Sequence, residues 1–111
     1  MFARVSVYEL DEGHASEAMA AFSPAIERLR DLAGFVDGYF LVERDGVQGV
    51  TLTFWESLDT MERSRVTAAR ARSEAANEAG ANVISTREYE VGLYAGPTRS
   101  RADVVGAGNI T

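Results

Sequence analysis

The sequence predicts an α+β domain of the ferredoxin-like class, in which strands and helices follow the order βαββαβ and the four strands form one antiparallel sheet. Two observations lead to this prediction. Four segments show an extended, alternating pattern, and two segments with apolar residues at three-and-four spacing separate them in the required order. In addition, two of the strands carry apolar side chains on both faces, which is typical of the central strands of a sheet.

The segment from Gly49 to Trp55 is the clearest central strand. Its two faces carry alternating residues, with Val50, Leu52 and Phe54 on one and Thr51, Thr53 and Trp55 on the other. Neither face is polar enough to lie in water, yet one layer of helices can cover only one of them. In a chain this short, the second cover comes most simply from another copy of the chain.

Length and composition limit the class of protein. The chain has 111 residues, enough for one core and therefore for one domain. It has no cysteine, which excludes disulfides and thiolate metal sites, and its net charge of -6 disfavours a nucleic-acid partner. The first residues read as a strand, and no apolar run approaches the roughly 20 residues that cross a bilayer. We therefore predict a cytoplasmic protein that binds neither nucleic acid nor membrane.

The first third of the chain is predicted to form a strand and a helix. Phe2 to Leu10 alternate with apolar residues on both faces, which predicts the second central strand. After a turn, an amphipathic helix is predicted that ends at Gly34. Its apolar positions are Met19, Phe22, Ile26, Leu29 and Ala33. Pro24 lies inside this helix and removes a backbone hydrogen bond, so we expect a kink between Ala20 and Pro24.

A hairpin and a second helix follow. Phe35 to Arg44 is predicted as a strand interrupted at Asp37-Gly38, and Asp45-Gly46 is typical of a tight turn. Ser57 and Asp59 are alternative caps of one helix that continues to Gly80. Its inward face is predicted to consist of Met61, Arg65, Ala68, Ala69, Arg72, Ala76 and Ala79. Such small side chains either bring the helix close to the sheet or leave a hollow.

Asn82 to Tyr94 is predicted as the last strand, after which Gly, Ser, Arg and Pro become frequent. We therefore divide the chain into a domain, residues 1 to 94, and a tail or partner-contacting arm, residues 95 to 111. Glu88 and Glu90 are predicted to face solvent or the edge of a dimer, because two carboxylates on one strand face repel each other when buried.

Three segments add evidence of another kind: Gly38-Tyr39-Phe40-Leu41-Val42, Thr53-Phe54-Trp55-Glu56-Ser57 and Tyr89-Glu90-Val91. Together they resemble the antibiotic biosynthesis monooxygenase family of dimeric α+β barrels, over residues 2 to 94. The resemblance implies a homodimer whose sheets pack face to face, with a ligand cleft between sheet and helices in each subunit. Family members include cofactor-independent monooxygenases of polycyclic aromatic phenols, haem-degrading enzymes and proteins without known activity, so the fold is implied more strongly than the chemistry.

The haem-degrading branch of that family carries an asparagine on the first strand, a tryptophan, and a histidine ligand on the next helix. The corresponding positions here are Ser6, Trp55 and Arg65, so only the tryptophan matches. The single histidine, His14, lies in the turn before the first helix, where a solvated position is commoner than a ligand position. We therefore predict neither haem nor any other cofactor.

The small helix face and the resemblance together predict a site beneath Trp55. We predict Trp55 and Arg65 as catalytic residues, the first as an aromatic wall and the second as the partner of an anionic ligand oxygen. The predicted substrate-binding residues are Ser6, Tyr8, Phe22, Tyr39, Arg72 and Tyr89. Structural interpretations remain open beside these: tryptophan in the core, arginines extending along the helix to solvent, and tyrosines packing in the sheet.

Two functions remain open. Hydrolases, phosphotransferases and metalloenzymes have no support, because the sequence has no matching motif. We predict a monooxygenase that oxidises an aromatic phenol or quinone-type metabolite without a cofactor, because a deprotonated phenol can react with dioxygen by itself. The alternative is a non-enzymatic dimer that binds a hydrophobic metabolite or offers an interaction surface. An open cavity on the order of several hundred Å³ would favour a small-molecule site.

Overall fold

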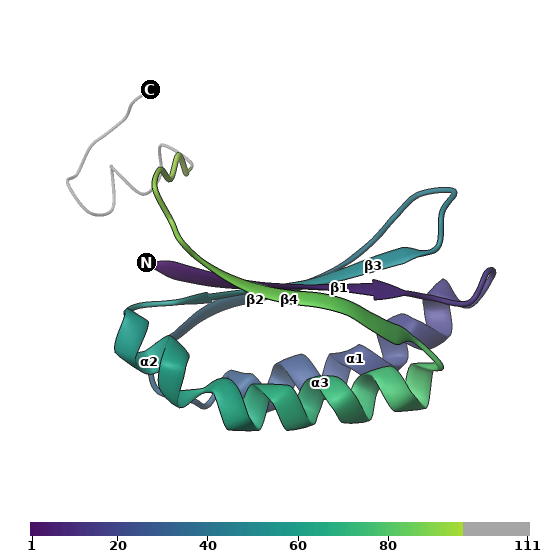
Figure 1. Cartoon of the computed structure of the whole chain (residues 1–111), viewed down its shortest axis with the longest axis horizontal. Coiled ribbons are helices and arrows are strands. Elements are labelled where there is room, and N and C mark those ends of the chain that lie inside the picture. Colours follow the sequence, from purple (N-terminus) through teal and green to yellow (C-terminus); the bar gives the residue numbers. More distant parts are fainter. Residues whose placement is uncertain (97–111) are drawn as a thin grey trace.

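The computed structural model describes residues 1 to 96, which form four strands and three helices. In chain order these are β1 (Phe2–Glu9), α1 (Ala15–Leu29), β2 (Phe35–Val42), β3 (Gln48–Trp55), α2 (Leu58–Arg63), α3 (Arg65–Ala79) and β4 (Asn82–Glu90). The strands form one antiparallel sheet in the order β2-β3-β1-β4. All helices lie on one side of this sheet, with α1 and α3 side by side along it (Figure 1). The predicted ferredoxin-like fold is confirmed.

Three further features of the described chain bear on the predictions. β4 ends at Glu90, four residues earlier than predicted. The predicted tail, residues 95 to 111, lies outside the described residues except for residues 95 and 96. None of the helices formed by residues 1 to 96 has the length and apolar character needed to cross a membrane.

β1 and β3 are the central strands, as their two-sided apolar pattern predicted. They pair along their whole length, with Phe2 opposite Trp55 and Val5 opposite Leu52. Strict alternation turns one set of β1 side chains toward the helices and the other toward the uncovered face. Arg4 and Ser6 therefore point from β1 toward the helices, where they give the sheet side of the candidate site its polar groups.

The β2–β3 hairpin agrees with its sequence signals. Glu43 and Gln48 close the hairpin, and Asp45 adopts a positive φ of 57°, which aspartate tolerates better than most residues. The pairing of β2 with β3 shifts register between Phe35 and Asp37. This irregularity coincides with the interruption predicted at Asp37-Gly38.

Helix α1 ends at Leu29, earlier than the predicted stop at Gly34. Gly34 instead belongs to a turn that approaches α2 so closely that a Cβ atom on it would lie 2.3 Å from Cβ of Thr60. Its carbonyl accepts a hydrogen bond from the amide of Glu56, which ties the turn to the end of β3. α1 continues through Pro24, whose side chain is exposed, and packs mainly through small residues and Phe22.

The single helix predicted up to Gly80 is wrong, because the chain breaks at Ser64 into α2 and α3. Ser57 caps α2 in a reciprocal capping box with Thr60, which decides between the two alternative caps. The predicted inward positions Met61, Ala68 and Ala76 are nevertheless buried on the two helices. The buried positions of α3 are Ala68, Ala71, Ala75 and Ala76, whereas Arg65 and Ala69 are exposed.

Candidate functional site

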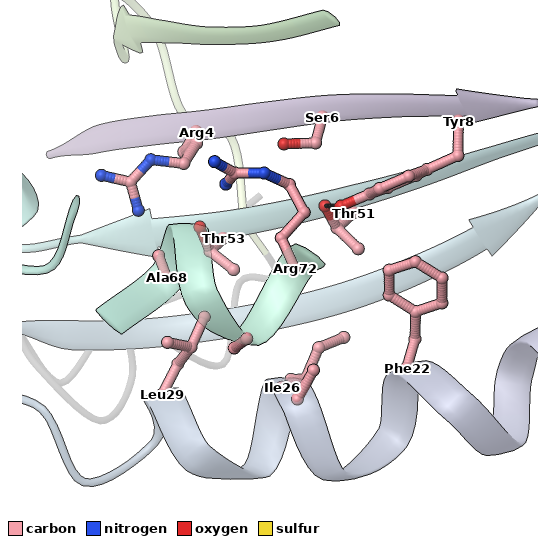
Figure 2. A pocket seen from close by; sticks show the side chains of 12 residues that line it. Arg4, Ser6, Tyr8, Phe22, Ile26, Leu29, Thr51, Thr53, Ala68 and Arg72 are labelled. Carbon is pink, nitrogen blue, oxygen red and sulfur yellow. Dashed lines mark hydrogen bonds between the residues drawn. The ribbon is translucent and has the colours of Figure 1, made fainter. Parts of the chain in front are cut away.

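A narrow cavity lies between the sheet and helices α1 and α3, with a volume of about 30 Å³. That is room for roughly two water molecules. Its sheet side is polar and its helix side is mainly apolar (Figure 2). The lining residues are Arg4, Ser6, Tyr8, Thr51 and Thr53 from the sheet, Phe22, Ala25, Ile26 and Leu29 from α1, and Ala68, Ala71 and Arg72 from α3.

Small side chains on both layers keep this space open. Ala68 and Ala71 are buried on α3, and Ser6 is buried opposite them on β1. A core helix more often carries leucine or isoleucine at such positions, which would fill the gap at normal packing density. Of the two outcomes expected for this helix face, a hollow is the one observed, and its volume of about 30 Å³ is below the several hundred Å³ typical of a small-molecule site.

The hydroxyl groups of the cavity are held in pairs. Tyr8 is fully buried, and its hydroxyl shares a hydrogen bond with Thr51 at 2.9 Å. Burial raises the pKa of Tyr8, against smaller opposing effects of its hydrogen bonds. Ser6 shares a hydrogen bond of 2.9 Å with Thr86 on the edge strand β4. Tyr8 therefore stays a neutral phenol at physiological pH, and the wall it forms is polar without being charged.

Arg4 is the buried cation of the cavity, only 4 % exposed. Its Nη2 donates to the carbonyl of Met61 at 2.9 Å, and its Nη1 donates to the hydroxyl of Ser64 at 3.1 Å. Its guanidinium also lies 5.8 Å from the centre of the Trp55 ring and forms a 2.8 Å ion pair with Glu88. Burial lowers the pKa of Arg4, and the bond to Glu88 opposes that shift. Arg4 thereby joins the sheet to the α2–α3 junction.

Glu88 faces the helix side of the sheet, so its predicted position toward solvent or a dimer edge is wrong. It accepts hydrogen bonds from Arg65 and from Arg4 at the same time. The hydrogen bonds from Arg65 are the main cause of its lowered pKa; burial is the next largest effect and opposes them, and the hydrogen bonds and charge of Arg4 lower the pKa further. The prediction rested on repulsion between the carboxylates of Glu88 and Glu90, and the two guanidinium groups that bond to Glu88 offset that repulsion. Glu90 is exposed, as predicted.

Replacing Glu88 with glutamine is expected to lower the free energy of unfolding at pH 7 by about 1–2 kcal/mol, because charge-assisted hydrogen bonds to Arg4 and Arg65 are weakened. The folded pKa lies below the unfolded value, so this contribution is present above the unfolded pKa of about 4.3 and is lost as pH falls through the folded pKa. Denaturant unfolding at pH 7 and near pH 3 measures it.

The matched control is Glu90→Gln, two residues further along β4 with an exposed carboxylate. It should leave the free energy of unfolding nearly unchanged at both pH values. An equal loss for Glu88→Gln at pH 7 and pH 3 would contradict the assignment, because protonation should make the wild-type and variant side chains similar.

Trp55 adjoins the cavity without lining it. Its ring is fully buried, its Nε1 donates to the hydroxyl of Thr53 at 3.0 Å, and its edge packs on Phe35 with ring centres 5.5 Å apart. Since Thr53 does line the cavity, the indole orients one of the cavity hydroxyls. Arg65 is further away: its side chain is 54 % exposed and bonds to Glu88 at 2.6 Å.

Four of the eight predicted site residues come together at the cavity: Ser6, Tyr8, Phe22 and Arg72. Tyr39 and Tyr89 lie opposite Leu52 and Ala3 and so belong to the uncovered face of the sheet. Prediction from sequence missed Arg4 as a site residue. The signal was available, because an arginine within a strand that is apolar on both faces must be paired.

Arg72 is the second cation of the cavity. It extends from α3 toward Arg4 and Ser6 on β1 (Figure 2). Within residues 1 to 96 its side chain makes no hydrogen bond or ion pair. Arg72 also lines a surface groove of about 360 Å³ between α3 and the start of β4. Its side chain therefore borders both the cavity and this groove.

The arrangement favours one kind of ligand chemistry. The described part of the chain contains no cluster of histidine, aspartate and glutamate that could hold a metal ion. The cavity offers two guanidinium groups and several hydroxyls on one side, and aliphatic and aromatic carbon on the other. Such a site can hold an anionic oxygen beside an apolar body.

Comparisons with known proteins agree with the fold. No protein-family model matches the sequence, and no curated protein matches it. Among solved structures, a protein from Deinococcus radiodurans assigned to the antibiotic biosynthesis monooxygenases is 13% identical with a TM-score of 0.69, and the match covers 87% of this chain and 98% of that one.

Two other solved structures have named activities. SnoaB of Streptomyces nogalater, a cofactor-independent oxygenase, is 16% identical with a TM-score of 0.68, covering 84% of this chain and 94% of its own. MhuD of Mycobacterium tuberculosis, a haem degrader with two haems in its active site, is 21% identical with a TM-score of 0.66, covering 86% and 100%. Proteins with different chemistry thus share this architecture. The chain has the fold of the antibiotic biosynthesis monooxygenases.

Proposed function

We propose that this protein is a cofactor-independent monooxygenase that converts an aromatic phenol into a quinone. The observation that carries the proposal is the position of Arg72, a cation without a partner among the described residues, at a cavity whose other side is apolar. A phenolate needs both features, because its oxygen carries charge and its ring is hydrophobic. The fold it shares with SnoaB supports the same reaction class.

The reaction needs no electrons from a cofactor. A phenol with a free ring position reacts with one dioxygen molecule to give a quinone and one water: the ring gains one oxygen, and the O–H and C–H hydrogens leave as water. The substrate supplies all the electrons that dioxygen accepts. The protein's part is to hold the phenolate oxygen, exclude bulk water and stabilise the negative charge that passes to oxygen.

The roles of the residues follow from their positions. In this proposal Arg72 pairs with the phenolate oxygen, Ser6 and Tyr8 donate hydrogen bonds, and Phe22 packs against the ring. Trp55 and Arg65 act indirectly, the first by orienting Thr53 and the second by holding Glu88 against Arg4. They are positioning residues, whereas Arg72 takes the anion-binding role that the sequence had assigned to Arg65.

Substrate entry requires a rearrangement, because a cavity of about 30 Å³ holds water and not an aromatic ring. Arg72 is the side chain whose movement changes this. Turning its guanidinium from the cavity into the adjoining groove would join the two spaces, and the groove alone has about 360 Å³. The charge would then lie at the mouth, next to the oxygen of an entering phenolate.

The proposal includes a homodimer formed through the uncovered sheet face. That face carries apolar side chains from all four strands, namely Ala3, Val5, Val7, Tyr39, Leu41, Val50, Leu52, Phe54 and Tyr89. Tyr39, Leu41 and Tyr89 are each 48 % exposed in the single chain. Arg87 and Asp37 lie on the edge strands of the same face, opposite Val5 and Phe54. A mainly apolar surface of this kind supports pairing with an identical surface on a second copy.

A screen of electron-rich naphthols and hydroxyquinones tests the function. Ligands are first found by the rise in melting temperature, and each hit is then followed with an oxygen electrode. We expect one dioxygen consumed per quinone formed. The matched variant is Ala68→Met, which fills the cavity with a flexible side chain and should abolish both the melting shift and oxygen uptake. Hits that consume no oxygen would support the second candidate, a non-enzymatic dimer that binds a hydrophobic metabolite.

A further inference from the structure

The cavity contains cations but no base. Among the residues that line it, β1 supplies the cation Arg4 and the neutral phenol Tyr8, and α3 supplies the cation Arg72. β3 and α1 contribute only threonine hydroxyls and apolar side chains. No carboxylate of the described residues lines the cavity, and Glu88 on β4, which pairs with the lining residue Arg4, already accepts hydrogen bonds from Arg4 and Arg65.

Neither of the remaining candidates can take a proton from a bound phenol. Tyr8 would have to be ionised first, and burial raises its pKa. Glu88 is held as a carboxylate by two guanidinium groups, which lower its pKa and therefore its basicity. A weakly acidic phenol that entered as the neutral species would therefore remain neutral in this site.

We infer that this site takes acidic phenols, such as hydroxyquinones and nitrophenols, as preformed anions whose counter-ion is Arg72, and that their protons go to solvent before or during entry. This inference rests on the proposed function for the biological role of the ligand, but it concerns binding alone. The inference narrows the substrate class from aromatic phenols in general to phenols that are mostly ionised near neutral pH.

Two features of the structure support the inference. First, Arg72 is a partly exposed guanidinium without a hydrogen bond or ion pair among residues 1 to 96, so it can bind an entering anion without giving up another partner. Second, Arg72 lines both the cavity and the neighbouring groove, so an anion in either space can reach its charge. Arg4 is less available, since its guanidinium already bonds to Glu88, Ser64 and Met61.

The probe for the test is 4-nitrophenol, whose ionised form has its own visible absorption band. The protein is titrated with it at several pH values around the pKa of the free phenol, and the spectrum of the bound ligand is recorded. We expect the bound ligand to be nitrophenolate even where most of the free ligand is neutral. We also expect affinity to rise with pH until the free ligand is ionised and then to level off.

Arg72→Met keeps a long apolar stem and removes the charge, so it should weaken nitrophenolate binding tenfold or more and remove the pH dependence. Arg72→Lys should retain much of both, which separates loss of charge from loss of folding. Arg70→Met is the matched control, because Arg70 is exposed on the same helix and does not line the cavity. Its affinity and pH profile should equal those of the wild type.

A bound ligand with the spectrum of neutral nitrophenol would overturn the inference, and so would nitrophenolate binding that Arg72→Met leaves unchanged, or no binding at millimolar ligand. The proposed function fails separately. Nitrophenolate binding through Arg72, together with no oxygen uptake by any phenol, would refute the oxygenase and leave the anion site standing. Oxygen uptake with phenols that bind as neutral species would refute the anion site and leave the oxygenase standing.

Discussion

Replacing Leu52 with glutamate is expected to abolish the folded dimer. Leu52 lies on central strand β3, between Val5 of β1 and Tyr39 of β2, in the middle of the uncovered apolar face. In the proposed homodimer each copy would bring an uncompensated carboxylate into a dry interface, at a cost of about 3–5 kcal/mol per charge. A monomer with that face in water is poorly stable, so we expect loss of folding rather than simple dissociation.

Light scattering and circular dichroism measure the two parts of this result. The wild type should scatter as a dimer at micromolar concentration, and Leu52→Glu should lose cooperative unfolding or aggregate. The control is Val66→Glu, which places the same charge on α3 where the native side chain is 74 % exposed. A monomeric wild type, or a Leu52→Glu variant that melts like the wild type, would contradict the dimer.

Replacing Trp55 with alanine is expected to lower the free energy of unfolding by about 3–5 kcal/mol. The indole is fully buried, and its removal deletes the packing on Phe35, the hydrogen bond to Thr53 and the surface beneath Arg4. The alanine residues of α3 cannot extend into the space left behind. Denaturant unfolding of the variant and the wild type under identical conditions measures the loss.

Two further variants separate packing from site chemistry. Tyr94→Ala removes an aromatic ring that is mostly exposed and should change the unfolding free energy by less than about 0.5 kcal/mol. Trp55→Phe keeps much of the packing but frees the hydroxyl of Thr53. It should preserve the dimer and weaken an aromatic ligand by about 1 kcal/mol or more. Equal stability of Trp55→Ala and the wild type would show that the indole does not hold this end of the core.

The strands could be predicted well because their pattern has a period of two and their neighbours follow from topology. The helix after Trp55 could not. Periodicity predicted one continuous helix, whereas Ser64 bonds to the carbonyl of Met61 and to Arg4 where the chain divides into α2 and α3. Periodicity placed both Arg65 and Arg72 on the inward face, but only Arg72 reaches the cavity, because Arg65 turns to pair with Glu88 on β4. A local pattern has no information about a contact with residue 4.

The same limit explains the charged residues. Glu88 looked like a surface carboxylate because its two partners, Arg4 and Arg65, lie far away in sequence. Whether a carboxylate can be partly buried depends on the charged groups that pair with it in the folded protein, and not on its neighbours along the chain. A paired carboxylate can face the covered side of a sheet, whereas an unpaired one is excluded from it.

The sequence by itself determined the order of the strands and helices, the central position of β1 and β3, and the apolar character of both faces of these strands. These follow from side-chain alternation and from the count of apolar faces, both of which are local properties. Only the tertiary structure decided which cations meet, which tyrosines face the helices and how small the cavity is. These depend on contacts between residues distant in sequence, where a shift of one helical step moves a side chain from the cavity to solvent.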